Sequence, residues 1–196
     1  MKQMFLLLTA IIVLSSCDHE SGSGNIINEK RSVDEFSGIT VGGSFEVEVK
    51  VGTTQQVEVD ADDNIIKYVK TTVSGNTLRI RLEGGHSYNN IHLKVYITTP
   101  GLKKIDASSS AEVKVLDVLK SDGKISLDAN SSADIEAEVD APAVDAEASS
   151  SGTIKLSGKT KDYTARVSSS GDIKSFELLT ENADVDANSS GSIDLH

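Results

Sequence analysis

The chain has 196 residues and a formal net charge of −11 at pH 7, with 30 acidic side chains against 19 Lys and Arg. This balance excludes nucleic acid as a partner and argues against peripheral binding to anionic lipid, because both contacts need basic surfaces. Cys17 is the sole cysteine, so the domain that follows it has no internal disulfide. Its stability must come from a hydrophobic core, and the length is sufficient for one.

Residues 1–17 have the pattern of a cleavable lipoprotein signal. An apolar stretch over 5–14 is too short to cross a bilayer, since a spanning helix needs about 20 residues. The ending Leu14-Ser15-Ser16-Cys17 is similar to the bacterial lipobox, whose cysteine takes a diacylglycerol. We therefore expect a signal peptide at 1–16, lipidation of Cys17, and attachment to the outer membrane by acyl chains alone, on its surface-exposed or periplasmic side.

Residues 17–24 combine Gly, Ser and acidic residues, a composition typical of a flexible tether. Acids directly after a lipid-bearing cysteine also resemble sorting signals of some surface-exposed Gram-negative lipoproteins, so two interpretations of this segment stay open. No Pro- or Gly-rich linker interrupts the chain after it, and we predict one domain over 25–196.

The first part of this domain alternates apolar and polar residues, which is the period-two pattern of β-strands. Clear alternation covers 45–51, 56–59, 78–82 and 92–97, and turn-forming residues separate these segments. Residues 64–70 are predicted to form one short helix.

A short phrase recurs five times in the second part of the chain. Each copy centres on Ser or Asn followed by two serines in succession, and the copies occupy 105–113, 127–135, 146–154, 165–173 and 185–193. Their middle serines are spaced by 22, 19, 19 and 20 residues. Strand-like segments repeated at this interval predict an all-β fold, a single-stranded parallel β-helix with about 20 residues per coil.

Alternation within such a coil places every second residue of a copy on the inner face. The middle residue is always serine, so we predict an inward structural ladder, hydrogen-bonded from coil to coil, of Ser109, Ser131, Ser150, Ser169 and Ser189. A catalytic serine is the alternative, but a nucleophile needs a nearby base, and no histidine lies between His92 and His196. We therefore assign no catalytic residue.

The remaining residues of each copy face outward and form charged columns. One column consists of Lys114, Glu136, Lys155, Lys174 and Asp194, and another of Asp106, Asp128, Glu147, Arg166 and Asp186. Stacked acids repel one another or hold a cation such as calcium, but the spacing fits neither an EF-hand nor a Gly-rich nonapeptide repeat. We interpret the columns as a solvated face and assign no metal ligand and no cofactor, with calcium binding left open.

Several motifs together resemble a known family, the auto-transporter adhesin head GIN domain of bacterial lipoproteins. The motifs are Gly24-Asn25-Ile26, the segment 31–41, the alternating Phe45-Glu46-Val47-Glu48-Val49, Ser74-Gly75-Asn76-Thr77-Leu78, and the Gly-x-Ile endings at Gly152, Gly171 and Gly191. The resemblance covers nearly all of the mature chain and implies an all-β, solenoid-like domain. It carries over no catalytic residues.

A lipid anchor followed by a long polar face predicts a cell-envelope binding or adhesion module that is not an enzyme. Its partner would be an envelope or host protein or a glycan, and its oligomeric state stays open. One alternative is a purely structural envelope protein. Another is a polysaccharide-acting β-helix enzyme, whose acid–base groups would meet on one face and would be Asp128, Asp134, Lys155 and Arg166.

Overall fold

The computed structural model describes residues 18–196, which form strands, turns and one short helix. The expected signal peptide (1–16) and the expected lipidation site Cys17 lie outside the described residues. No helix within 18–196 is long and apolar enough to cross a membrane.

The elements of the first part, in chain order, are β1 (Asp18–Ser21), β2 (Ile26–Arg31), β3 (Gly38–Gly42), β4 (Glu46–Val51), β5 (Gln56–Asp62), the 3-10 helix η1 (Ile66–Tyr68), β6 (Val69–Ser74), β7 (Thr77–Leu82), β8 (His86–Asn89) and β9 (Leu93–Thr99). Those of the second part are β10 (Lys104–Ser108), β11 (Glu112–Val115), β12 (Leu119–Lys120), β13 (Lys124–Asn130), β14 (Asp134–Ser149), β15 (Thr153–Val167), β16 (Asp172–Ala187) and β17 (Ser192–Asp194). The strands predicted from alternation are confirmed as β4, β5, β7 and β9, and the predicted helix is reduced to η1.

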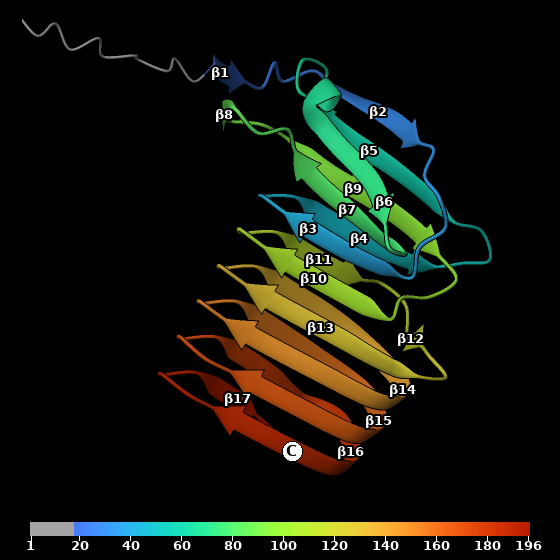
Figure 1. Cartoon of the computed structure of the whole chain (residues 1–196), viewed down its shortest axis with the longest axis vertical. Coiled ribbons are helices and arrows are strands. Elements are labelled where there is room, and N and C mark those ends of the chain that lie inside the picture. Colours follow the sequence, from blue (N-terminus) through green and yellow to red (C-terminus); the bar gives the residue numbers. More distant parts are fainter. Residues whose placement is uncertain (1–17) are drawn as a thin grey trace, which may run out of the picture.

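All strands except β1 and β8 belong to one mixed sheet of 15 strands. The sheet runs in the order β2-β5-β9-β4-β11-β14-β13-β10-β3-β7-β6, and β15, β16 and β17 continue it beyond β14. The first residues of β14 pair with β11 and its last residues pair with β13, so the sheet turns back on itself. Two flanks therefore enclose one hydrophobic core in a nearly closed sheet (Figure 1).

The all-β class is confirmed, but the expected single-stranded parallel β-helix over 25–196 is wrong. Three ladders are antiparallel, those of β2 with β5, β5 with β9 and β6 with β7. Between β6 and β7, Gly75 and Asn76 both have a positive φ, of 56° and 67°, as a two-residue type I′ turn requires. Such a turn reverses the chain into a hairpin, whereas a parallel pair needs a long crossover.

The five copies of the repeated phrase do lie directly over one another. Parallel pairing aligns Ile105 with Leu127, Leu127 with Ala146, Ala146 with Ala165, and Ala165 with Val185. The inward positions of the first copy are buried as the alternation predicts, namely Ile105, Ala107, Ala111 and Val113. Each fully buried large aliphatic side chain stabilises the fold by about 1.5–3 kcal/mol, so the aligned columns build the core.

The middle serines, in contrast, do not point inward as expected. Ser109, Ser131, Ser150, Ser169 and Ser189 are exposed and have φ between 51° and 59°, and the serine after each has φ between 64° and 66°. Two successive positive φ values are typical of a type I′ turn, here closed in the third copy by the Gly152 N–H, which donates to the Ser149 carbonyl at 2.9 Å. A turn of two residues keeps the apolar/polar alternation in phase on both sides. The sequence pattern therefore gives no sign that a turn is present.

Neighbouring turns are joined through their backbones. The N–H of Ser110 donates to the carbonyl of Ser131 at 3.1 Å, and the N–H of Ser132 donates to that of Ser150 at 3.1 Å. Equivalent bonds of 3.3 and 3.1 Å link the later copies. The coil-to-coil contacts at this corner are therefore backbone hydrogen bonds, and a role of the serine hydroxyls in them stays a prediction.

Residues 18–24 differ from the flexible tether expected there. β1 pairs in parallel with β8, and the loop after β5 holds the Gly/Ser segment. The Gly24 N–H donates to Asp62 Oδ1 at 2.7 Å, and the Ser23 hydroxyl donates to Asp63 Oδ1 at 2.6 Å. Asp62 is 2% exposed, and its other oxygen accepts the His92 N–H at 2.7 Å. Residues 18–24 are therefore joined to the rest of the described chain by strand pairing and hydrogen bonds.

Replacing one serine turn by a turn sequence suited to positive φ should stabilise the protein. A left-handed conformation costs a non-glycine residue about 1–2 kcal/mol, and Asn-Gly is the preferred type I′ sequence. We expect Ser150→Asn with Ser151→Gly to raise the free energy of unfolding by about 1 kcal/mol, measured by urea denaturation. Ser126→Gly is the control, because glycine inside β13 should lower the free energy of unfolding. A loss of stability on changing the turn would contradict the strain inferred there.

Candidate functional site

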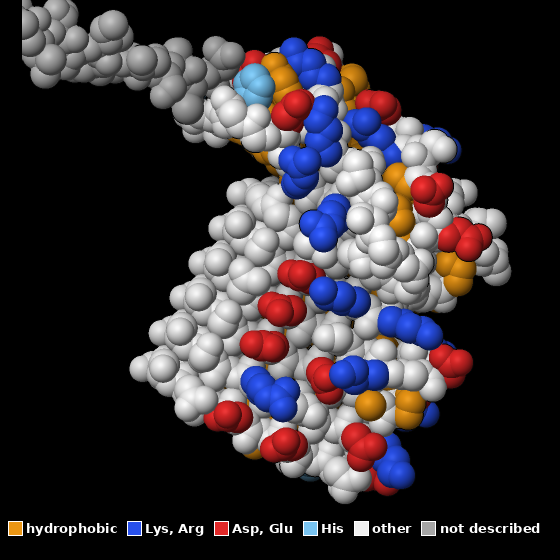
Figure 2. All heavy atoms as spheres, in the orientation of Figure 1, with side chains coloured by type: hydrophobic (Ala, Val, Ile, Leu, Met, Phe, Trp, Pro, Cys, Tyr) orange, Lys and Arg blue, Asp and Glu red, His pale blue; other side chains and the backbone are white. Residues whose placement is uncertain are grey.

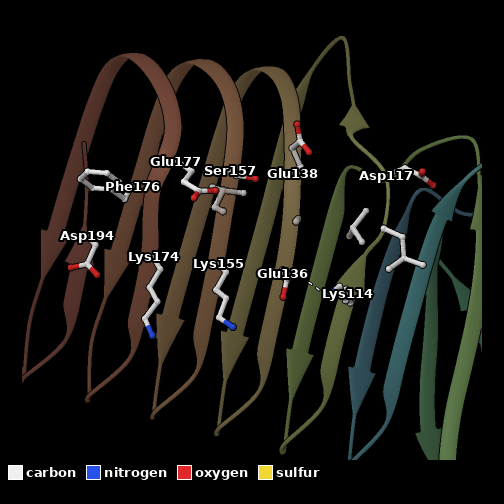
Figure 3. A pocket seen from close by; sticks show the side chains of 14 residues that line it. Lys114, Asp117, Glu136, Glu138, Lys155, Ser157, Lys174, Phe176, Glu177 and Asp194 are labelled. Carbon is white, nitrogen blue, oxygen red and sulfur yellow. Dashed lines mark ion pairs between the residues drawn. The ribbon is translucent and has the colours of Figure 1, made fainter.

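An open groove of about 650 Å³ crosses the flank formed by β11, β14, β15, β16 and β17. Its charged wall is the outward column predicted from the repeat, Lys114, Glu136, Lys155, Lys174 and Asp194. Successive members come from successive strands, and their side chains point out from the same side of the sheet (Figure 3). Five strands about 4.8 Å apart make this row about 19 Å long.

One end of the groove is made by the longest repeat. Glu112 pairs with Asp134, an offset of 22 residues, but Lys124 pairs with Ala143, an offset of 19. The extra residues are taken up between β11 and β13, where Leu116 and Asp117 extend along the groove. Leu116 is 40% exposed, so this end presents an apolar side chain to solvent.

The other end is made by a β-bulge in β16. Lys155 pairs with Lys174, but Ser157 pairs with Glu177, so β16 contains one residue more than β15 at this point. The Ser175 side chain is buried and its hydroxyl donates to the Asp194 carbonyl at 2.9 Å. The bulge therefore turns Phe176 outward, where 61% of it is exposed. Bulges of this kind are known to re-aim side chains at functional sites.

The lysines of the groove are only partly paired with carboxylates. Lys114 Nζ lies 3.2 Å from Glu136 Oε1, and Lys174 Nζ lies 3.1 Å from Asp172 Oδ2. Within the described chain, Lys155 has no carboxylate at ion-pair distance. Exposed pairs contribute about 0–1 kcal/mol each, so these side chains can exchange their present contacts for a ligand at little cost.

The opposite flank carries a row of acids instead. Pairing of β10, β13 and β14 aligns Asp106, Asp128 and Glu147. Partial burial raises the pKa of the Asp128 carboxyl, a hydrogen bond from Asn130 Nδ2 at 3.4 Å opposes this rise, and the charges of Asp106 and Glu147 add to it. Across residues 18–196, no three His, Cys, Asp or Glu side chains are arranged to hold a metal ion.

The ionised Asp128 carboxylate should destabilise the fold, and replacing Asp128 should therefore give a pH-dependent gain in stability. Because its pKa is raised in the folded state, ionisation of Asp128 destabilises the fold, and the cost disappears below the unfolded-state pKa of about 3.9. We expect Asp128→Asn to raise the free energy of unfolding at neutral pH, with a gain that shrinks to zero as the pH falls below that value. Urea denaturation over a pH series measures it. Glu181→Gln, at an exposed carboxyl, is the control, and a gain that does not vary with pH would speak against the assignment.

The four residues considered for a polysaccharide-acting enzyme do not meet. Asp134 and Lys155 lie on the groove flank, where β14 and β15 begin. Asp128 and Arg166 lie on the opposite flank, where Glu147 separates them in the row. The core lies between the two pairs, so the expectation that they share a face is wrong.

Phe176 is the residue of the groove that the sequence analysis missed. The outward column assigned from the repeat includes Lys174 in the fourth copy and stops two residues before Phe176. A signal was present: the last spacing between middle serines is 20 residues and the one before it is 19. One additional residue in a stack of paired strands predicts a bulge, which lies at Ser175 and Phe176.

Residues 35–196 match the model of a protein family described as "Putative auto-transporter adhesin, head GIN domain". The chain belongs to this family. The resemblance seen in the sequence motifs is thereby confirmed. No curated protein matches this head GIN domain chain.

Three crystal structures share the fold of this head GIN domain. A putative adhesin from Parabacteroides distasonis is 22% identical, with a TM-score of 0.72 over 91% of this chain and 85% of its own. A putative lipid binding protein from the same species is 20% identical, with a TM-score of 0.71 over 91% and 85%. A putative adhesin from Parabacteroides merdae is 22% identical, with a TM-score of 0.67 over 91% and 84%. At these identities the likeness establishes the fold alone.

Proposed function

We propose that this head GIN domain is a lipid-anchored adhesion module of the bacterial outer membrane, which binds a partner in its groove and catalyses no reaction. The main support for this proposal is that the two irregular repeats border the same groove. One is the long repeat between β11 and β13, and the other contains the bulge in β16. Irregularities that served only to end or cap the stack would have no reason to meet at one surface. The adhesin names of the family and of two structural relatives support the same role.

The chemistry of the groove fits an extended segment with charged and apolar groups. Its lining includes the buried residues Ala137 and Leu156, its wall carries three lysines and two acids, and Leu116 and Phe176 stand at its ends. A row about 19 Å long accommodates about six residues of extended polypeptide at 3.3 Å each. The exposed Phe176 ring also offers a stacking surface for a sugar, so a glycan is the other partner class to be tested.

The lipid anchor is tested at Cys17. We expect the native chain to incorporate labelled palmitate and to sediment with the outer membrane, because several acyl chains on one residue give stable attachment. Cys17→Ser should abolish both labelling and sedimentation, and a serine variant that still carries the label would overturn the anchor. Protease treatment of intact cells then separates a surface-exposed domain from a periplasmic one.

The groove is tested by partner capture with two charge-matched variants. We expect the mature chain to retain an envelope protein, host protein or polysaccharide that Lys155→Glu with Lys174→Glu fails to retain, with an affinity loss of about tenfold or more. Lys159→Glu with Lys161→Glu makes the same charge change outside the groove and should retain it. Phe176→Ala, at an exposed side chain, should weaken capture without lowering the free energy of unfolding. A partner held equally by all variants would place binding elsewhere.

A further inference from the structure

A basic surface interrupts this acidic protein at its N-terminal end. Residues 66–82, comprising η1, β6 and β7, contain Lys67, Lys70, Arg79 and Arg81 and no acid. We call these four residues the basic hairpin. Lys and Arg side chains gather over this part of the molecule, whereas a row of acids follows below on the same face (Figure 2).

The pairing within the hairpin brings like charges together. Lys70 lies directly opposite Arg81, and Arg79 lies opposite Thr72. Like charges directly opposite one another on neighbouring strands destabilise a sheet, so folding does not account for them. Lys70 Nζ is 2.8 Å from Glu83 Oε2, while Lys67, Arg79 and Arg81 are exposed and, within residues 18–196, have no carboxylate at ion-pair distance.

The start of the described chain is fixed against this surface. Asp18 pairs with His86, and the His86 ring lies 4.6 Å from the ring of Tyr68, measured between centroids. Lys67 Nζ lies 4.7 Å from the centre of the Tyr68 ring, and the Tyr68 hydroxyl donates to Glu20 at 2.7 Å. Residue 17 is bonded to the first residue of β1, and Glu20 of β1 contacts Tyr68 beside the basic hairpin. Consecutive Cα atoms are about 3.8 Å apart, so residue 17 is tied closely to this strand.

From this placement we infer that the basic hairpin rests on anionic phospholipid headgroups. The inference builds on the proposed lipidation of Cys17. An acylated residue 17 lies at the headgroup layer, and β1 leaves no flexible linker between that layer and the fold. An anionic leaflet attracts exposed cations that come within the screening length of about 8 Å from its surface. Tyr68, His86 and Tyr88 form an aromatic cluster next to them, and tyrosine favours this interface.

The net charge of the chain does not oppose this contact. The acidic row of Asp106, Asp128 and Glu147 begins on β10, which is separated from β7 by β3, and continues away from the hairpin. Charges beyond a screening length contribute little, so the local surface decides binding. Two acids that contact this region are already engaged, Glu20 by the Tyr68 hydroxyl and Glu83 by Lys70. The contact also fixes the direction in which the rest of the stack extends, away from the membrane.

Vesicle flotation of the mature chain carrying Cys17→Ser tests the surface without the anchor. All core residues lie between Phe36 and Leu178, so this chain retains the whole described core. We expect it to bind vesicles of phosphatidylcholine mixed with phosphatidylglycerol, to bind phosphatidylcholine alone more weakly, and to be released by salt. Arg79→Glu with Arg81→Glu should lower the partition coefficient by about tenfold or more, since one cation contributes about fivefold.

Lys159→Glu with Lys161→Glu is the control, because it makes the same change of charge at exposed positions of β15. Equal binding by the wild-type chain and the arginine variant, an equal loss in the control, or no preference for phosphatidylglycerol would overturn the inference. Because the assay omits the acyl chains, its outcome is independent of the anchor. An unlabelled Cys17 with intact vesicle binding would defeat the proposed anchor alone, and a labelled Cys17 without vesicle binding would defeat the headgroup contact alone.

Discussion

The fold depends on parallel, in-register hydrogen bonding between consecutive repeats. Each repeat must place the same inward positions over those of the previous one, and this requires nearly constant repeat length. The corner after each serine turn adds a steric limit, since a Cβ on Gly152 would overlap the Ala129 carbonyl oxygen of the preceding repeat. Glycine at this position in the third and fourth copies, Gly152 and Gly171, therefore lets the backbone of one repeat approach that of the preceding repeat closely.

The same constraint explains where a binding site can arise. A stack of identical repeats has a flat outer face, and extra residues cannot enter the core without breaking the register. They must be displaced outward, as between β11 and β13, or absorbed in a bulge, as at Ser175 and Phe176. Both displacements border one groove, so the surface that departs most from the repeat is also the one that is hollowed.

Strand positions were predictable because alternation reports burial directly: residues 45–51 and 92–97 alternate because one side of β4 and of β9 faces the core. Alternation carries no information on strand direction, which explains why the antiparallel ladders were missed. The alternation also continues unchanged across a two-residue turn. For this reason Ser109 and its counterparts were predicted to face inward, whereas they lie at an exposed corner. The charged wall of the groove followed from spacing alone. The basic hairpin did not, because a net charge of −11 averages over surfaces that the fold keeps apart.

The two repeats between Ser131 and Ser169 are each 19 residues long, so the number of such repeats sets the length of the groove. Duplication or loss of one such repeat would preserve the register at both ends, since every repeat presents the same turn and the same inward columns to its neighbours. Each added repeat would separate the two irregular ends of the groove by one more strand spacing, about 4.8 Å. A change in repeat number would thus lengthen or shorten the groove and leave the architecture unchanged.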